Sequence, residues 1–148
     1  MDARVSIVSL GVADMQRSRQ FYEQGLGWRA SAIGDGEVAF YQTGAVIVGL
    51  YDRAKLAAEE NLPPVNDPQN VHSGITLAQN QASKADVDDV VAGAVRAGGT
   101  LRKEPADTFW GGYAGSFADP DSHIGEIAWN PFFTLDESGI RLPDYPFI

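Results

Sequence analysis

The chain has 148 residues, of which 44% are hydrophobic and 21% are charged, and its formal net charge is −9. These values are typical of one soluble globular domain with its own core. The eleven basic residues are scattered, which disfavours a nucleic-acid partner, because phosphate backbones are bound by clustered Lys and Arg. No run approaches the roughly 18 apolar residues of a membrane span, and no signal-peptide pattern opens the chain, so we expect a cytoplasmic protein with no membrane partner. The absence of cysteine excludes disulfides, thiolate metal sites and cysteine nucleophiles.

The first third of the chain predicts a strand, a helix and three further strands. Residues 5–12 alternate, with Val8, Leu10 and Val12 on the expected core face. A helix is expected over 15–24, with Asp14 as its N-cap. Short β segments separated by glycine turns follow at 28–33, 37–42 and 45–51.

The same order returns in the second half, after a proline-rich connector that begins with a short helical stretch at 54–60. The second helix, 84–97, is the clearest element, because Ser83 and Asp86 form a capping box in front of a regular apolar stripe. Strands are expected at 74–79, 100–105, 113–118 and 124–129. The chain is therefore an internal repeat of architecture with about 60 residues per unit.

The last two of these strands form a hairpin around a turn that Asp119 and Pro120 favour. Glu126 is the lone carboxylate in the second of them. An ionised carboxylate must face water, a partner or a ligand. Glu126 is thus either a functional group or an exposed glutamate on an edge strand.

After residue 131 the chain is rich in aromatics and proline and shows no clear period. Phe132, Phe133, Tyr145 and Phe147 would be costly to leave in water. We expect this tail to pack on the body or on a second subunit.

Three features together resemble the vicinal oxygen chelate superfamily, which includes glyoxalase, bleomycin resistance proteins, fosfomycin resistance enzymes and extradiol dioxygenases. They are the two βαβββ units, the motif V-x-D-M-x-x-S-x-x-F-Y at 12–22, and F-A-D-P-D-x-H at 117–123 followed by Glu126. The resemblance covers about residues 4–131. It implies an α+β fold in which two tandem βαβββ modules form a curled, cup-shaped mixed sheet. The single domain then divides into module one (4–52), a connector (53–71), module two (72–131) and a C-terminal tail (132–148).

Metal-dependent members of that superfamily carry ligands at the first and last strand of each unit. The resemblance places these four positions at Ile7, near Gly49, at Gly74 and at Glu126, with His72 two residues before Gly74 on the same face. Of the four, only Glu126 has a ligand atom. Catalytic metals usually need two or three protein ligands, so we infer that the metal site is lost and expect no cofactor. A divalent metal held by Glu126 and His72 is the alternative.

The family register also implies which residues line the cup. The inner face would collect Ile7, Ser9, Ile47, Gly49, Tyr51, Gly74, Thr76, Ala78, Ile124, Glu126 and Ala128. We place Trp110 and Tyr113 at the rim, with Tyr41 across the cup, because aromatic side chains stack on planar or cationic ligands. Trp110 has an equal alternative as a hydrophobic plug or a dimer contact. An apolar cup with few polar groups is typical of a small-molecule site.

Three functions remain open at this stage. The first is a metal-free binding protein of the bleomycin-resistance kind, which sequesters a small organic molecule. The second is a glyoxalase-like lyase or isomerase that uses Glu126 as a general base, or as a metal ligand with His72. The third is an interaction module without a small ligand, favoured if Tyr51, Trp110 or the tail fills the cup. The resemblance also implies a homodimer.

Overall fold

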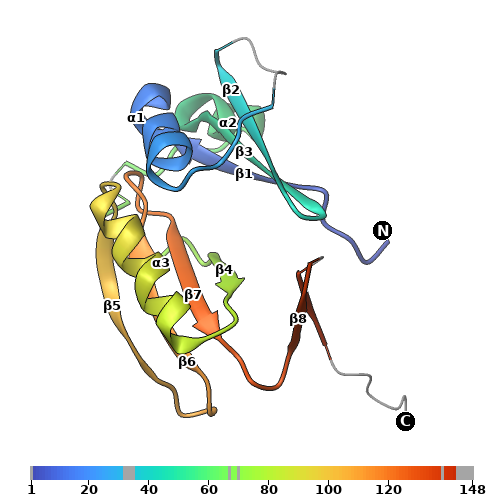
Figure 1. Cartoon of the computed structure of the whole chain (residues 1–148). Helices are drawn as coiled ribbons and strands as arrows, with labels where there is room; N and C mark the ends of the chain where they lie inside the picture. The colour runs from blue at the N-terminus through green and yellow to red at the C-terminus, as the bar shows by residue number, and fades with distance from the viewer. Residues whose placement is uncertain (1, 32–35, 67, 70, 138, 143–148) are drawn as a thin grey trace.

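A computed structural model describes residues 2–31, 36–66, 68–69, 71–137 and 139–142. Two mixed sheets and a few helices make up the fold, which confirms the expected α+β class (Figure 1). The first sheet has the order β1-β3-β2, formed by Ile7–Val12, Val46–Asp52 and Val38–Thr43. The second has the order β4-β7-β6-β5, formed by Thr76–Asn80, Ile124–Trp129, Tyr113–Ala118 and Thr100–Asp107.

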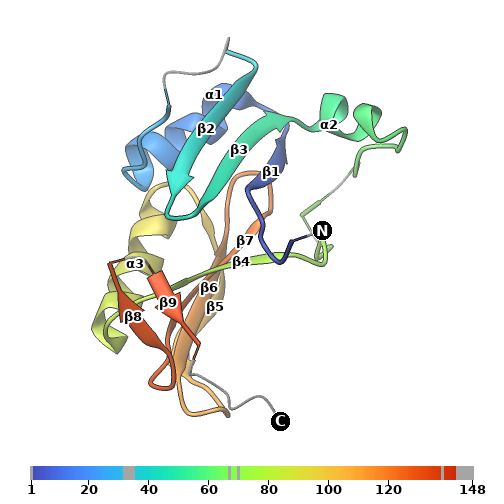
Figure 2. The same ribbon diagram turned by 90° about the vertical axis from the view of Figure 1, so that its right-hand side faces the viewer.

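The two sheets repeat one topology, as the sequence predicts. In each sheet the first strand runs parallel to the last, β1 beside β3 and β4 beside β7, and the last strand pairs antiparallel with the strand before it. Figure 2 shows both sheets from the side opposite α1 and α3, so these two helices lie on a common side of the sheets, whereas α2 (Arg53–Glu59) stands beyond β1. The opposite faces are therefore open in the same direction.

The strand expected at 28–33 is reduced to a single bridge between Ala30 and Tyr41, and residues 32 and 33 lie outside the described part of the chain. The end of the preceding helix explains the difference. The Trp28 amide donates to the Tyr22 carbonyl, and the Trp28 ring packs against the core beside Tyr22. This anchoring keeps residue 28 out of the sheet, and pairing starts only at Ala30.

The first helix begins as expected and then changes its hydrogen-bond pattern. Asp14 caps α1 (Met15–Arg19) by accepting from the Arg17 amide at 3.0 Å. The chain continues without a break as a π-helix, η1 (Gln20–Gly25), which buries Phe21 and Tyr22. Both aromatic rings join the hydrophobic core from this segment.

The other helices follow the predicted signals. Helix α3 (Lys84–Arg96) starts at Ser83, whose hydroxyl accepts from the Asp86 amide at 3.1 Å. The short helix expected at the start of the connector is α2 (Arg53–Glu59), and Asp52 caps it. None of the helices in the described residues is long and apolar enough to cross a membrane.

One continuous core joins the two modules. Its first-module members come from β1, η1, β2 and β3, and its second-module members come from α3, β6 and β7. The Phe21 and Phe117 rings meet across the junction with centroids 6.1 Å apart. The buried members are Leu10, Val12, Phe21, Tyr22, Ala39, Tyr41, Val48, Leu50, Val87, Val91, Ala94, Phe117 and Ile127.

A buried carboxylate from the β6–β7 turn also connects the modules. The Asp121 side chain is fully buried and accepts from the Ala13 amide at 2.8 Å and from the Ser18 hydroxyl at 2.6 Å. Arg17 and Arg53 both reach the same carboxylate, at 3.0 and 2.9 Å. Module two thereby holds the start of α1 and the start of α2 with one acidic side chain.

The described part of the tail forms a small hairpin of β8 (Thr134–Asp136) and β9 (Gly139–Arg141), whereas the sequence shows no period there. Figure 1 shows this hairpin standing away from the second sheet, on the side opposite α3. Phe132 and Leu135 remain exposed, so in this single chain the hairpin is not covered by the body. Tyr145 and Phe147 lie outside the described residues.

Candidate functional site

Strand pairing decides which side chains share the open faces of the sheets. Val8, Leu10 and Val12 turn toward the helices, as predicted, so Ile7 and Ser9 lie on the open face of β1. Residues paired across neighbouring strands lie on the same face of a sheet. The same rule identifies the open-face residues of the second sheet. The open faces therefore include Ile7, Ser9, Phe40, Ile47, Gly49, Tyr51, Thr76, Ala78, Ser116, Ile124, Glu126 and Ala128.

The repeat of strand register corrects one sequence-based position. Ser9 pairs with Gly49 in module one, and Ala78 pairs with Glu126 in module two, so these pairs are equivalent. Two residues before Ser9 is Ile7, and two residues before Ala78 is Thr76. The module-two equivalent of Ile7 is thus Thr76 and not Gly74.

Gly74 precedes the strand instead of belonging to it. Its φ is +84°, in the left-handed region, and β4 begins only at Thr76. The sequence could not show this shift, because the turn before β4 has no apolar pattern from which to count.

Glu126 lies in the second sheet with small neighbours on both sides. Ala78 of β4 and Ser116 of β6 are its partners across the strands. The side chain is half-buried, and it makes no hydrogen bond or ion pair with any other described residue. A carboxylate without a partner on a largely apolar face is available to a ligand.

His72, the alternative metal ligand, is exposed and bound to its own loop. Its Nδ1 accepts from the Gly74 amide at 2.9 Å, and its Nε2 lies 3.0 Å from the Thr76 hydroxyl. Because Nδ1 acts as an acceptor, the proton of the neutral ring is on Nε2. Neither nitrogen then offers a free lone pair, so metal binding would require His72 to break one of these bonds.

The space beside Gly49 is occupied by an aromatic ring that the sequence analysis did not assign to the cup. Phe40 pairs with Gly49 across β2 and β3, and a Cβ placed on Gly49 would lie 3.1 Å from the Phe40 ring. Gly49 therefore accommodates Phe40. Because side chains alternate along a strand, Phe40 and Val38 lie on the same face of β2. Pairing with β3 then shows that this face is the open one.

Tyr41 lies on the opposite face from the one predicted. It pairs with the core residue Val48, its side chain is almost completely buried, and its hydroxyl donates to Glu23 at 3.0 Å. Burial and then the Glu23 hydrogen bond raise the pKa of the Tyr41 phenol. The sequence prediction failed because two adjacent aromatics, Phe40 and Tyr41, leave the parity of the strand undecided.

Tyr113 also faces the helix side and not the cup rim. Its hydroxyl donates to Asp88 of α3 at 2.9 Å, and the Lys84 ammonium lies 5.4 Å from the ring centroid. Trp110 stays in the β5–β6 loop, where its ring covers Gly112 so closely that a Cβ there would overlap it. The Trp110 ring thus packs on its own loop.

Tyr51 is on the open face, as predicted, but its hydroxyl is already bonded to Glu59 of α2 at 2.7 Å. That hydrogen bond raises the pKa of the Tyr51 phenol. A ligand on this face would meet the ring more readily than the hydroxyl.

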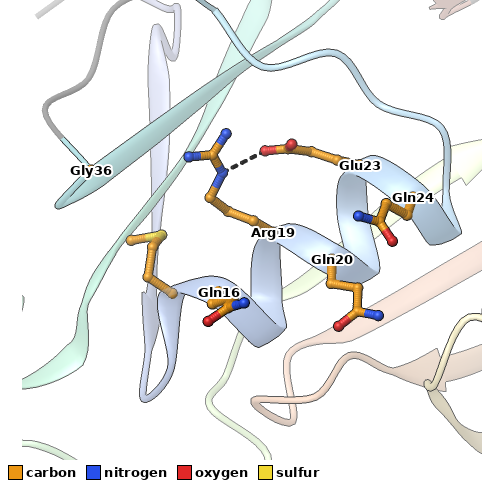
Figure 3. A pocket seen from close by; sticks show the side chains of 7 residues that line it. Gln16, Arg19, Gln20, Glu23, Gln24 and Gly36 are labelled. Atoms are coloured by element: carbon orange, nitrogen blue, oxygen red, sulfur yellow. Dashed lines mark hydrogen bonds and ion pairs between the residues drawn. The ribbon is translucent and has the colours of Figure 1, made fainter.

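A hollow of about 540 Å³ lies on the outer surface of α1 and η1, away from the open faces (Figure 3). Arg19 and Glu23 form an ion pair across it at 2.6 Å, surrounded by Gln16, Gln20 and Gln24. The hydrogen bond from Arg19 lowers the pKa of Glu23. The two charged side chains of this hollow, Arg19 and Glu23, therefore neutralise each other's charge.

The chemistry of the four family positions is thus one carboxylate, one hydroxyl and two side chains without donor atoms. Among the described residues, no three or more His, Cys, Asp or Glu side chains gather in a group able to hold a metal ion.

The profile of the Glyoxalase/Bleomycin resistance protein/Dioxygenase superfamily matches residues 4–127. The chain belongs to this superfamily. This finding confirms the resemblance based on the sequence motifs, and it agrees with the two repeated modules.

Solved structures of the superfamily are similar over nearly the whole chain. A glyoxalase-related enzyme from Fulvimarina pelagi is 27% identical, covers 96% of this chain and 99% of its own, and has a TM-score of 0.85. A glyoxalase/bleomycin resistance protein/dioxygenase family enzyme from Burkholderia phytofirmans PsJN is 25% identical over 86% of this chain and 98% of its own, with a TM-score of 0.70. A lactoylglutathione lyase from Agrobacterium tumefaciens, at 17% identity, 86% and 94% coverage and a TM-score of 0.63, shares the fold alone. No curated protein matches the chain.

Proposed function

We propose that this protein binds a small organic molecule on the open face of its sheets, and that the metal site of its superfamily has been lost. The single observation that carries the proposal is the isolated Glu126 carboxylate, at the one family position that still has an acidic ligand atom. Ile7 and Gly49 occupy two of the other positions, and the Thr76 hydroxyl at the fourth is in contact with His72.

Apolar side chains on the open faces of the two sheets would provide the surface for the organic part of the ligand. Ile7, Phe40, Ile47 and Ile124 lie on the open faces, and Ile7 is 49% exposed in the single chain. Glu126 would accept a hydrogen bond from the ligand or neutralise a positive group on it. The net charge of −9 also favours a cationic molecule.

The first test is metal content together with thermal stability. Protein purified without a chelator or an affinity tag should contain no stoichiometric metal, and added Zn, Mn, Ni or Fe(II) should leave the melting temperature unchanged. A ligand that binds the folded state would raise it. Stoichiometric metal, or a clear metal-dependent rise, would contradict the proposed loss.

The second test is a screen of cationic and aromatic small molecules by thermal shift, followed by titration of the hits against Glu126→Gln. We expect roughly ten- to hundredfold weaker binding of a cationic hit, since a hydrogen bond to a charged group contributes about 1.5–3 kcal/mol. The exposed Glu104→Gln, on β5, serves as the matched control and should bind as the wild type does. Equal affinity in Glu126→Gln would remove Glu126 from the site.

The alternative is a metal-free lyase or isomerase, and the unpartnered carboxylate of Glu126 favours it specifically. A general base needs a free carboxylate within reach of a carbon-bound proton. Exchange of solvent deuterium into a carbonyl compound, followed by NMR, would distinguish this function from sequestration. Exchange in the wild type that is lost in Glu126→Gln would establish proton transfer, and binding without exchange would exclude it for that compound.

A further inference from the structure

We propose that a hollow at the junction of the two modules binds the phosphate-type oxyanion of a small molecule. The hollow measures about 430 Å³, which is within the usual range for small-ligand sites. Both modules and the connector contribute to it. Its polar lining includes Arg17, Gln69, Thr100, Arg102 and Ser122. None of its lining residues is among the open-face residues named above for the proposed function.

Two guanidinium groups from different modules meet at this hollow, and each is held by a single hydrogen bond. Arg17 donates through Nη2 to Asp121 at 3.0 Å, and Arg102 donates through Nη2 to the Gln69 carbonyl at 2.8 Å. Their other side-chain N–H groups make no hydrogen bond to a described residue. Oriented guanidinium groups with unused donors match the oxygens of a phosphate.

The carboxylates beside the hollow do not neutralise the positive charge of Arg17 and Arg102. Asp121 is shared by Arg17 and Arg53. Asp119 lines the hollow, but its two oxygens already accept from Tyr22, from His123 and from backbone amides. Among the described residues that line the hollow, two guanidinium groups, of Arg17 and Arg102, outnumber one carboxylate, that of Asp119.

Ser122 occupies a backbone position that favours glycine. Its φ is +71°, in the left-handed region, where a residue with a Cβ is strained. It lies on the wall of the hollow together with Thr100, and neither side-chain hydroxyl has a partner among the described residues. Two unused hydroxyls beside two guanidinium groups complete a set of donors for an oxyanion.

Isothermal titration with inorganic phosphate and with phenyl phosphate, in a phosphate-free buffer of low ionic strength, tests the proposal. Saturable binding is expected for at least one probe, and at least tenfold weaker binding in Arg102→Gln. Lys103→Gln removes the same charge one residue further along β5, outside the hollow, and should stay within about twofold of the wild type. Tighter binding of phenyl phosphate than of inorganic phosphate would indicate that the hollow binds a phosphate ester. Equal binding of the two probes would indicate that it binds free phosphate.

A second variant separates binding from folding. Ser122→Gly removes the hydroxyl and the backbone strain together, so it should raise the melting temperature and still weaken the probe about threefold or more. The absence of saturable binding, or equal weakening by Arg102→Gln and Lys103→Gln, would overturn the proposal. Glu126→Gln should leave phosphate affinity unchanged, so failure here and failure of the proposed function are distinguishable.

Discussion

Asp119 and Asp121 occupy the β6–β7 turn two residues apart, and they perform different tasks. Asp121 holds α1 and α2 of the other module through Arg17 and Arg53. Asp119 organises its own turn by accepting from the amides of Asp121 and His123, and it also accepts from the Tyr22 hydroxyl at 2.7 Å. A motif that reads as a turn in the sequence is therefore the polar link between the modules.

The first prediction concerns acid stability. Burial by itself would raise the pKa of Asp119, but the hydrogen bond and charge of His123 and the hydrogen bond from Tyr22 together lower this pKa below its ordinary value. A lowered pKa in the folded state stabilises the protein above the pKa of the unfolded chain, about 4. We expect the free energy of unfolding to decrease as pH falls below about 4, through the folded-state pKa of Asp119.

Urea denaturation at pH 7, 5, 4 and 3 measures this effect. Asp119→Asn should lower the free energy of unfolding at pH 7 by roughly 3 kcal/mol and should show a smaller further decrease on acidification than the wild type. Asp89→Asn, on the exposed face of α3, is the control and should keep the wild-type pH profile. An unchanged pH profile in Asp119→Asn would show that other carboxylates govern acid unfolding.

At the scale of elements, the contact between η1 and α3 depends on a glycine that ends the π-helix. A Cβ on Gly25 would lie 2.4 Å from the Cβ of Ala97, which follows α3. The two helical segments can therefore approach only because residue 25 has no side chain. The same approach brings Phe21 to Phe117 in the shared core.

Gly25→Ala should lower the free energy of unfolding by about 1–3 kcal/mol, the usual cost of overpacking. Gly93→Ala is the matched control within α3, because a Cβ there meets only the Arg96 side chain, at 3.7 Å. It should be neutral or should stabilise the protein by about 0.5–1 kcal/mol through helix propensity. Chemical denaturation of both variants measures the difference, and equal effects would mean that the modules can separate slightly at no cost.

For the whole molecule, the main feature is apolar surface that a single chain leaves uncovered. Ile7 is exposed on the open face, and Phe132, Leu135 and Ile140 are exposed on and beside the projecting β8–β9 hairpin. Leu135 and Ile140 are partners across the hairpin, and adjoining exposed apolar side chains usually mark interaction surfaces. The homodimer expected from the family resemblance would cover such surface.

Sedimentation velocity tests this expectation. We predict a dimer for the wild type and a shift toward monomer for the double variant Leu135→Asp and Ile140→Asp, because both residues are exposed in the single chain and do not belong to its core. Phe109→Asp introduces the same charge at a fully exposed ring in another loop and should remain dimeric. A wild type that stays monomeric at high concentration would contradict the prediction.

Local signals in the sequence determined the elements of this protein. Strands β6 and β7 match their predicted bounds, Asp14 and Ser83 cap their helices as expected, and β1 faces the core with Val8, Leu10 and Val12. These features depend on neighbouring residues, whose periodicity and hydrogen-bonding groups are visible in one short stretch.

Tertiary structure decided the parts of the site that depend on the partner strand. Pairing with β3 directs Phe40 to the open face and Tyr41 to the core. Pairing with β7 shows that Thr76, and not Gly74, is the second-module residue equivalent to Ile7. A shift of one residue in register moves every side chain of a strand to the other face, and the sequence of that strand alone does not fix the shift. The junction around Asp121 likewise joins residues about 100 positions apart, and only the packing of the two modules brings them together.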